Sequence, residues 1–295
     1  MSELSIRLNT LLDQFASRNA DTRTAAQRLR QAISSSPSLV KRFESAIAEG
    51  KLKTIELLPR SATERAHMSD EGVLAIGRDA VVGNATTEFM DQLRDTLGHE
   101  IAHAHYKGYD FALNVLSEEV EKLAFERTET RNYTAVLQNF LAAARRNEAV
   151  AAIGGWNANI SKMIADSGGR PLDRAAVLER MAQVNPRCVI EVNGVYQMAA
   201  GIVLNADLTA NVSDQSVEAF AKCYFDGSKG SLGPQGKSSY TDYYLSYGVS
   251  LIVRMERYNN QYGDPDRALV QINLAALGTT EAALEVAGLT FQGKG

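Results

Sequence analysis

The chain has 295 residues, 45% of them hydrophobic and 22% charged, and its 31 basic and 35 acidic residues give a formal charge of −4. This composition is typical of a folded globular protein, so it excludes a disordered chain and a collagen-like repeat. The slight acidic excess is not the basic footprint that nucleic acids require, and we expect no nucleic-acid partner.

The N-terminal residues contain no basic segment followed by an apolar one. We therefore expect synthesis in the cytoplasm without a Sec signal peptide. No apolar run approaches the ~20 residues needed to cross a bilayer, so no membrane span is expected. Cys188 and Cys223 lie far apart and outside any CxxC pattern, and we interpret them as two separate buried thiols rather than as one isolated bridge.

Apolar residues at helical spacing predict helices throughout residues 1–50, where Pro37 begins the third helix and Gly50 ends it. We treat 1–50 as an N-terminal helical segment and 51–295 as the remaining domain. Two short strands are predicted next, at 52–58 and 72–76, and His67 lies in the loop between them. A long helix follows from Thr87 to about Tyr106.

The rest of the chain alternates helical and extended patterns. Asn193-Gly194 is typical of a two-residue turn between antiparallel strands. Helices are predicted at 112–127, 131–145, 147–165, 172–183, 239–258 and 280–287, and strands at 188–191, 195–198, 202–204 and 269–274. The fold class is therefore α+β, mostly helical, with a small mixed or antiparallel sheet.

The predicted helix over 87–106 contains the sequence His99-Glu100-Ile101-Ala102-His103, an H-E-x-x-H motif. Histidines four residues apart lie one helical turn apart, so both imidazoles can bind a single Zn²⁺. Glu100 lies beside them and is the candidate general base, because it can accept a proton from a water molecule activated by the metal.

A catalytic zinc site needs a third protein ligand, and no third histidine stands at a suitable spacing. Glu148 is the first candidate, because small residues surround it and would let its helix approach the histidine helix closely. Glu118 and Glu119 are alternatives, although they lie in a charged stretch typical of a solvated helix face. Other downstream glutamates are weaker candidates.

Three stretches carry a resemblance to a known family: HEIAHA at 99–104, the segment from Tyr133 through NEAVAAIGGWNA at 147–158, and LGPQGKSSYTDYY at 232–244. They resemble the zincin-like metallopeptidase domains of bacterial polymorphic toxins and of type IV and type VI secretion effectors. The resemblance extends from about residue 37 to the end.

The resemblance implies a zincin-like metallopeptidase fold with zinc on His99, His103 and Glu148 and with Glu100 as the base. It also implies secretion or delivery into a target cell, a peptide, protein or peptidoglycan-peptide substrate, and an immunity protein or secretion adaptor as partner. In this family the strand before the active-site helix is the sheet edge that binds an extended peptide, a role that falls on 72–76. Alternatively, this strand only closes the sheet.

Tyrosines recur at helical spacing from Tyr240 onward, a pattern more typical of a core than of a site. Tyr240 and Tyr243 are nevertheless our candidates for stabilising a developing oxyanion, because a phenol can donate a hydrogen bond to it. Trp156 is expected to be a buried anchor close to Glu148.

Two functions remain open at this point. The first is a zinc metallopeptidase of the effector or toxin type. The second is a catalytically inactive, metal-stabilised binding module that grips a partner in its cleft. The presence of Glu100 favours the first, because a structural metal site has no use for a general base.

Overall fold

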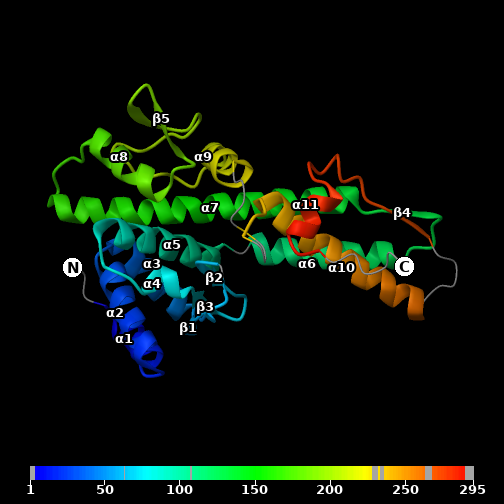
Figure 1. Ribbon diagram of the computed structural model, residues 1–295, viewed down its shortest axis with the longest axis horizontal. Helices are drawn as coiled ribbons and strands as arrows, with labels where there is room; N and C mark the ends of the chain where they lie inside the picture. Colours follow the sequence, from blue (N-terminus) through cyan, green and yellow to red (C-terminus); the bar gives the residue numbers. More distant parts are fainter. Residues whose placement is uncertain are drawn as a thin grey trace. The chain divides into compact units, whose positions relative to one another are not determined.

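The computed structural model describes residues 4–62, 64–106, 108–227, 232, 236–262 and 268–289, without the side chains of 108–112. The chain divides into two compact units (Figure 1). The first unit comprises Met1–Lys107 and Glu148–Tyr224, and the second comprises Gly108–Asn147 and Phe225–Gly295. Residues 1–50 thus lie within the first unit, whereas 51–295 is shared between the two.

The first unit begins with three helices that pack on one another and on the histidine helix. Asn19 starts the second of them with a capping box, and Pro37 begins the third, where its missing N–H costs no hydrogen bond. Leucine, isoleucine and phenylalanine side chains of these helices form one hydrophobic core together with Leu93 and Leu97. The helices are α1 (Ile6–Ala16), α2 (Ala20–Ser34), α3 (Pro37–Ala48), α4 (Arg78–Val81) and α5 (Thr87–His105).

A small mixed sheet lies against these helices. Its strands are β1 (Thr54–Leu57), β2 (Ala66–Met68) and β3 (Val73–Ile76), in the order β1-β3-β2. β1 pairs with β3 in parallel and β2 pairs with it antiparallel. The expectation that strand 72–76 is a free edge for a peptide is therefore wrong, because both of its sides are already hydrogen-bonded. His67, expected in a loop, lies on β2.

The turn predicted at Asn193-Gly194 is confirmed. Both residues have positive φ, 51° and 77°, as a two-residue hairpin turn requires. They join β5 (Val189–Val192) to β6 (Val195–Met198) in an antiparallel pair. The strand expected at 202–204 is reduced to a single bridge between Leu204 and Ala210.

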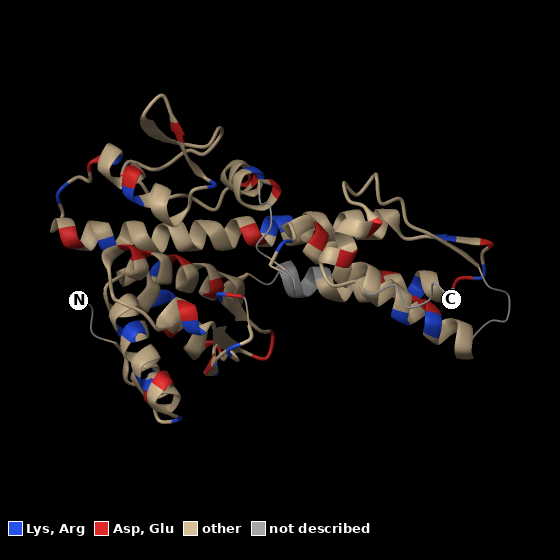
Figure 2. Ribbon diagram, viewed as in Figure 1, with Lys and Arg blue, Asp and Glu red and all other residues tan. Residues whose placement is uncertain are grey.

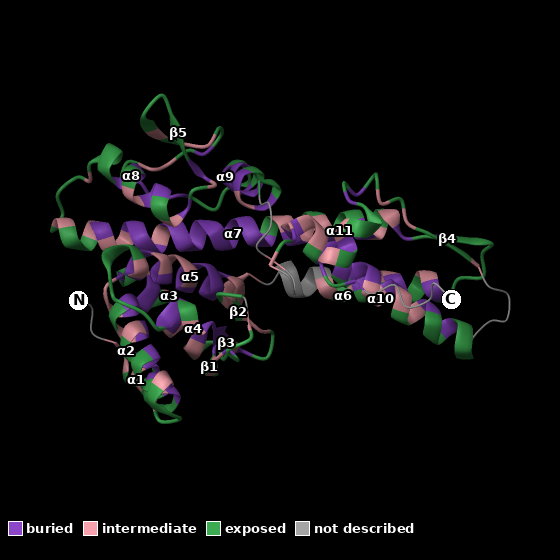
Figure 3. Ribbon diagram, in the orientation of Figure 1, coloured by how far each residue is buried: buried purple, intermediate pink, exposed green. Residues whose placement is uncertain are grey.

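The two helices predicted at 131–145 and 147–165 are one 34-residue helix, α7 (Thr134–Ser167). Its part in the first unit carries no charged residue between Glu148 and Lys162 (Figure 2). This stretch is buried on several sides (Figure 3), and most of its apolar side chains join a second core with α8 (Arg174–Val184) and α9 (Asp214–Phe220). Trp156, fully buried as expected, donates a hydrogen bond from Nε1 to the Leu208 carbonyl oxygen at 2.9 Å.

Cys188 and Cys223 form a disulfide, so the expectation of two separate thiols is wrong. The pairing brings together two segments 35 residues apart, which local sequence patterns cannot show. It links the residue before β5 to a π-helical turn, η1 (Ala221–Asp226), that follows α9.

We expect the double substitution of Cys188 and Cys223 by serine to destabilise the protein by about 4 kcal/mol, the loop-closure entropy of a 35-residue loop. Thermal unfolding with and without dithiothreitol measures this. The reductant should lower the melting temperature of the wild type and leave that of the double variant unchanged. A wild type that is insensitive to reduction would contradict the stabilising role.

The second unit is built from helices around an aromatic core. Its helices are α6 (Gly108–Phe125), the first part of α7, α10 (Tyr240–Tyr262) and α11 (Glu281–Val286), and β4 (Thr130–Asn132) pairs in parallel with β7 (Leu269–Gln271). Glu256 accepts hydrogen bonds from Arg131 at 2.9 Å and from the Tyr133 hydroxyl at 2.5 Å. This buried network ties α10 to the segment before α7.

The α+β class with dominant helix is confirmed. In the part of the chain that the structure describes, no helix combines the length and the apolar character needed to cross a membrane. Basic and acidic residues are interspersed in each unit (Figure 2).

Candidate metal centre

The histidine helix α5 begins with a regular cap and presents two different faces. Thr86 caps it by accepting a hydrogen bond from the Phe89 N–H. Leu93, Leu97 and Ile101 are fully buried in the first core. His99 and His103 project from another side of the helix, where each is only slightly exposed, by 10% and 17% of its side chain.

Glycine brings α7 against α5 near the motif. A Cβ atom on Gly98 would lie 2.6 Å from the Gly154 carbonyl oxygen, and one on Gly155 would lie 2.7 Å from that of Asp95. Both distances are shorter than side chains tolerate, so the two backbones touch directly. The small residues in this close contact are these glycines together with Ala102 and Ala158.

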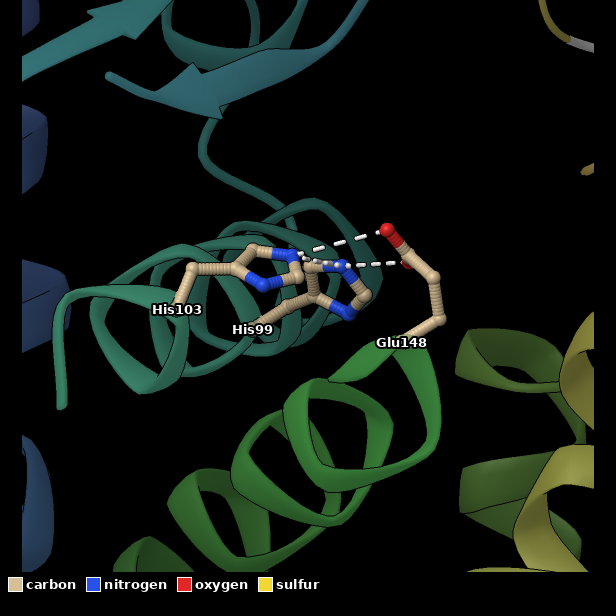
Figure 4. A group of neighbouring side chains, drawn as sticks. All are labelled: His99, His103 and Glu148. Atoms are coloured by element: carbon tan, nitrogen blue, oxygen red, sulfur yellow. Dashed lines mark hydrogen bonds and ion pairs between the residues drawn. The ribbon is translucent and has the colours of Figure 1, made fainter. Parts of the chain in front are cut away.

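This contact places Glu148 of α7 opposite both histidines (Figure 4). The Glu148 carboxylate oxygens lie 3.3 Å from Nε2 of His99 and 3.8 Å from Nε2 of His103. The two Nε2 atoms are 3.0 Å apart. All three residues belong to the first unit, and the described residues contain no other such group of potential metal ligands.

The group has the chemistry and spacing of a metal site. A tetrahedral metal with bonds of about 2.0–2.1 Å has ligand atoms about 3.3 Å apart, close to the three separations observed. Two imidazoles and one carboxylate are the donor set of many catalytic zinc sites. The buried His99, His103 and Glu148 can therefore hold a metal ion.

Electrostatics favour a positive charge at this point. Burial lowers the pKa of His99, but the hydrogen bond and negative charge of Glu148, with smaller contributions from Glu100 and Asp95, raise it to about 9. Asp95 lies one turn before His99, and burial raises the pKa of its carboxyl group to about 6. The positive charge of a protonated His99 would compensate the Glu148 carboxylate, and a bound metal cation would compensate it in the same way.

Glu100 is buried on α5 directly after His99, with 7% of its surface exposed. Within the described residues its carboxylate forms no hydrogen bond or ion pair, whereas Glu148 is engaged with both histidines. A buried carboxylate without a structural partner next to a metal cluster is a candidate proton acceptor.

The remaining predicted residues belong to the second unit. Glu118 and Glu119 are on α6 in the second unit and do not belong to the metal-ligand group. Tyr240 and Tyr243 are on α10, also in the second unit. Tyr240 is buried, and its ring stacks on Phe225 with 5.2 Å between centroids, as a core residue does.

Tyr224 is a neighbour of the cluster that the sequence did not indicate. Its ring centroid lies 5.4 Å from that of His99. The Arg187 guanidinium lies 5.4 Å from the centre of the same ring, and the disulfide partners Cys188 and Cys223 directly follow Arg187 and precede Tyr224. In the sequence, Arg187 and Tyr224 each stand next to a cysteine. This adjacency points to the metal centre only when the disulfide between Cys188 and Cys223 is known. Tyr224 also lies in η1, and π-helical turns frequently occur at functional sites.

Comparisons with known proteins found no relative of this chain. No family model, no curated protein and no solved structure matches it.

Proposed function

We propose that this protein is a zinc-dependent metallopeptidase, a bacterial effector or toxin that hydrolyses peptide bonds of a protein or of peptidoglycan. The observation that carries the proposal is the buried group of His99, His103 and Glu148 with Glu100 beside it on α5. The resemblance of three sequence stretches to effector metallopeptidases supports the biological part, including delivery into a target cell.

Each residue of the site has a defined task in this proposal. A zinc ion held by His99, His103 and Glu148 would supply Lewis-acid activation of a water molecule and of the substrate carbonyl. Glu100 accepts a proton from the attacking water and returns it to the amine nitrogen that leaves when the peptide bond breaks. Glu100 and Glu148 are both buried, which strengthens the electrostatic interactions of their carboxylates within the site.

An inactive metal-stabilised module is the competing function, and the surroundings of Glu100 disfavour it. A structural zinc site closes its fourth position with a protein ligand. Among the described residues the group offers three ligands, and Glu100 contributes nothing to holding the fold through hydrogen bonds.

The first test is the zinc content of the purified chain by elemental analysis. We expect about one zinc per chain in the wild type and its loss in His99→Ala and in Glu148→Ala, because three protein ligands are needed. Glu119→Ala is the matched control, a glutamate on another helix, and should keep the metal. A wild type that folds normally but binds no added zinc would refute the proposal.

A further inference from the structure

The first unit contains a cavity of about 570 Å³ at the other end of the α5–α7 pair from the metal centre. It is lined by the start of α5, including Thr86 and Met90, whereas His99 and His103 lie near the end of that helix. The end of α7, the end of α2, the start of α3 and one residue of α8 complete the wall. The volume is within the range of small-molecule sites, roughly 300–1,000 Å³.

Positive charge exceeds negative charge around this cavity. Arg94, Lys162 and Arg180 line it, and Asp166 is the one acidic residue of the lining. Lys162 pairs with Asp166, so these two charges cancel.

The two arginines share a single counter-ion. Asp91 accepts hydrogen bonds from Arg94 and, at 2.5 and 2.8 Å, from Arg180. Three cations and two carboxylates therefore leave one positive charge uncompensated at the cavity wall.

Arg94 is the most buried of the three cations. Arg94 is only 3% exposed, and the other side chains to which it donates hydrogen bonds, Asn159 and Ser35, are neutral. Burial lowers the pKa of Arg94, Asp91 counteracts this, and the nearby charge of Arg180 lowers it further. A buried cation next to a second cation is stabilised by an anion.

The backbone and hydroxyl groups around the cavity also favour a bound anion. Thr86 is the N-cap of α5 and Pro37 the first residue of α3, so two helix N-termini, each with a partial positive charge, reach the wall. The hydroxyl groups of Thr86 and Thr87 add hydrogen-bond donors. Charged side chains, helix ends and hydroxyls together form the usual environment of a bound phosphate.

We propose that this cavity binds a small phosphate-bearing anion. Arg180 and Lys162, at the more accessible side of the wall, contact the phosphate oxygens, and the buried Arg94 supplies the fixed positive charge beneath them. The chemistry is shared by inorganic phosphate and by the phosphate group of a metabolite such as a nucleotide. The proposal is independent of the metal centre and of its activity.

The test is isothermal titration calorimetry of the metal-free full chain with inorganic phosphate and, separately, with adenosine monophosphate. We expect one site per chain for at least one of the two ligands. Tighter binding of the nucleotide would identify an organic phosphate as the ligand, and tighter binding of phosphate would identify the free ion. If neither ligand binds with a Kd of about 10 mM or tighter, the proposal is overturned. A Kd of that size corresponds to a binding free energy of roughly 3 kcal/mol.

Substitutions locate the site. Lys162→Gln and Arg180→Gln should each weaken binding about tenfold or more, the loss expected for one charge-assisted hydrogen bond. Lys162→Gln keeps the proposal testable if Arg180→Gln fails to fold, because the ion-pair partner of Lys162 among the described residues is the exposed Asp166. Arg174→Gln, an exposed arginine on the same helix as Arg180, is the matched control and should bind as the wild type does.

One further variant separates this cavity from the metal centre. His99→Ala should bind phosphate with unchanged affinity. Loss of binding in His99→Ala, or wild-type affinity in both Lys162→Gln and Arg180→Gln, would overturn the assignment to this cavity.

Discussion

Glu100→Gln is expected to bind zinc as the wild type does and to hydrolyse its substrate about 10²–10⁴-fold more slowly, the usual contribution of a general base. Glutamine has the same size and stays buried on α5, but its amide cannot accept a proton from water. The ligands His99, His103 and Glu148 are untouched, so the metal should remain. Elemental analysis gives the zinc content, and mass spectrometry of products from casein and from peptidoglycan stem peptides gives the rate.

Glu88→Gln is the control for this experiment. Glu88 lies in the first turn of the same helix and is hydrogen-bonded to Gln92 at the surface, so its substitution should change neither zinc content nor rate. If the wild type cleaves a substrate and Glu100→Gln cleaves it equally fast, Glu100 is not the base. If zinc-loaded wild type cleaves neither class of peptide, the binding-module function gains support.

Gly98→Ala is expected to destabilise the first unit by about 1–3 kcal/mol or more and to lower zinc occupancy. The new Cβ would lie 2.6 Å from the Gly154 carbonyl oxygen and 2.9 Å from the Gly155 Cα, both backbone atoms that cannot rotate away. The α5 and α7 helices must then separate, and Glu148 moves away from the two histidines. Chemical denaturation measures the free energy of unfolding, and elemental analysis measures the zinc.

Ala142→Val is a suitable comparison, because it also enlarges a side chain on one of these helices, but at an exposed position of α7. It should cost only the small difference in helix propensity, about 0.5 kcal/mol, and leave the zinc content unchanged. Wild-type stability and zinc content in Gly98→Ala would show that the close approach of the two helices does not position the site.

Local patterns predicted those parts of the molecule that short-range physics determines. The apolar stripe and the spacing of His99 and His103 gave the helix and its two faces. Asn193-Gly194 predicted the hairpin, because few residue pairs accept positive φ at both positions. The small residues after Glu148 suggested a close helix contact, and the structure shows very close approach of α7 to α5 at Gly154 and Gly155.

The features that were missed depend on pairing between distant segments. The sequence of strand 73–76 is compatible with a central strand and with an edge strand. Its place in the sheet is determined by the two strands that pair with it. The sequence predicted two helices, 131–145 and 147–165, where the structure has the single 34-residue helix α7, whose continuity through the buried Asn147 and Glu148 depends on tertiary packing. Tyr224 reaches His99 through a chain path of more than a hundred residues, which no periodicity encodes.

The disulfide between Cys188 and Cys223 makes the surroundings of the metal centre depend on whether the protein is in a reducing or an oxidising compartment. Glutathione and thioredoxin keep such cysteines reduced in most cytoplasms, whereas the periplasm and the extracellular space allow the bridge to persist. Tyr224, which contacts His99, and Arg187, which contacts Tyr224, each lie next to one cysteine of that bridge. A newly made chain in a reducing cytoplasm would therefore carry a looser wall beside His99 than the same chain after transfer to an oxidising space.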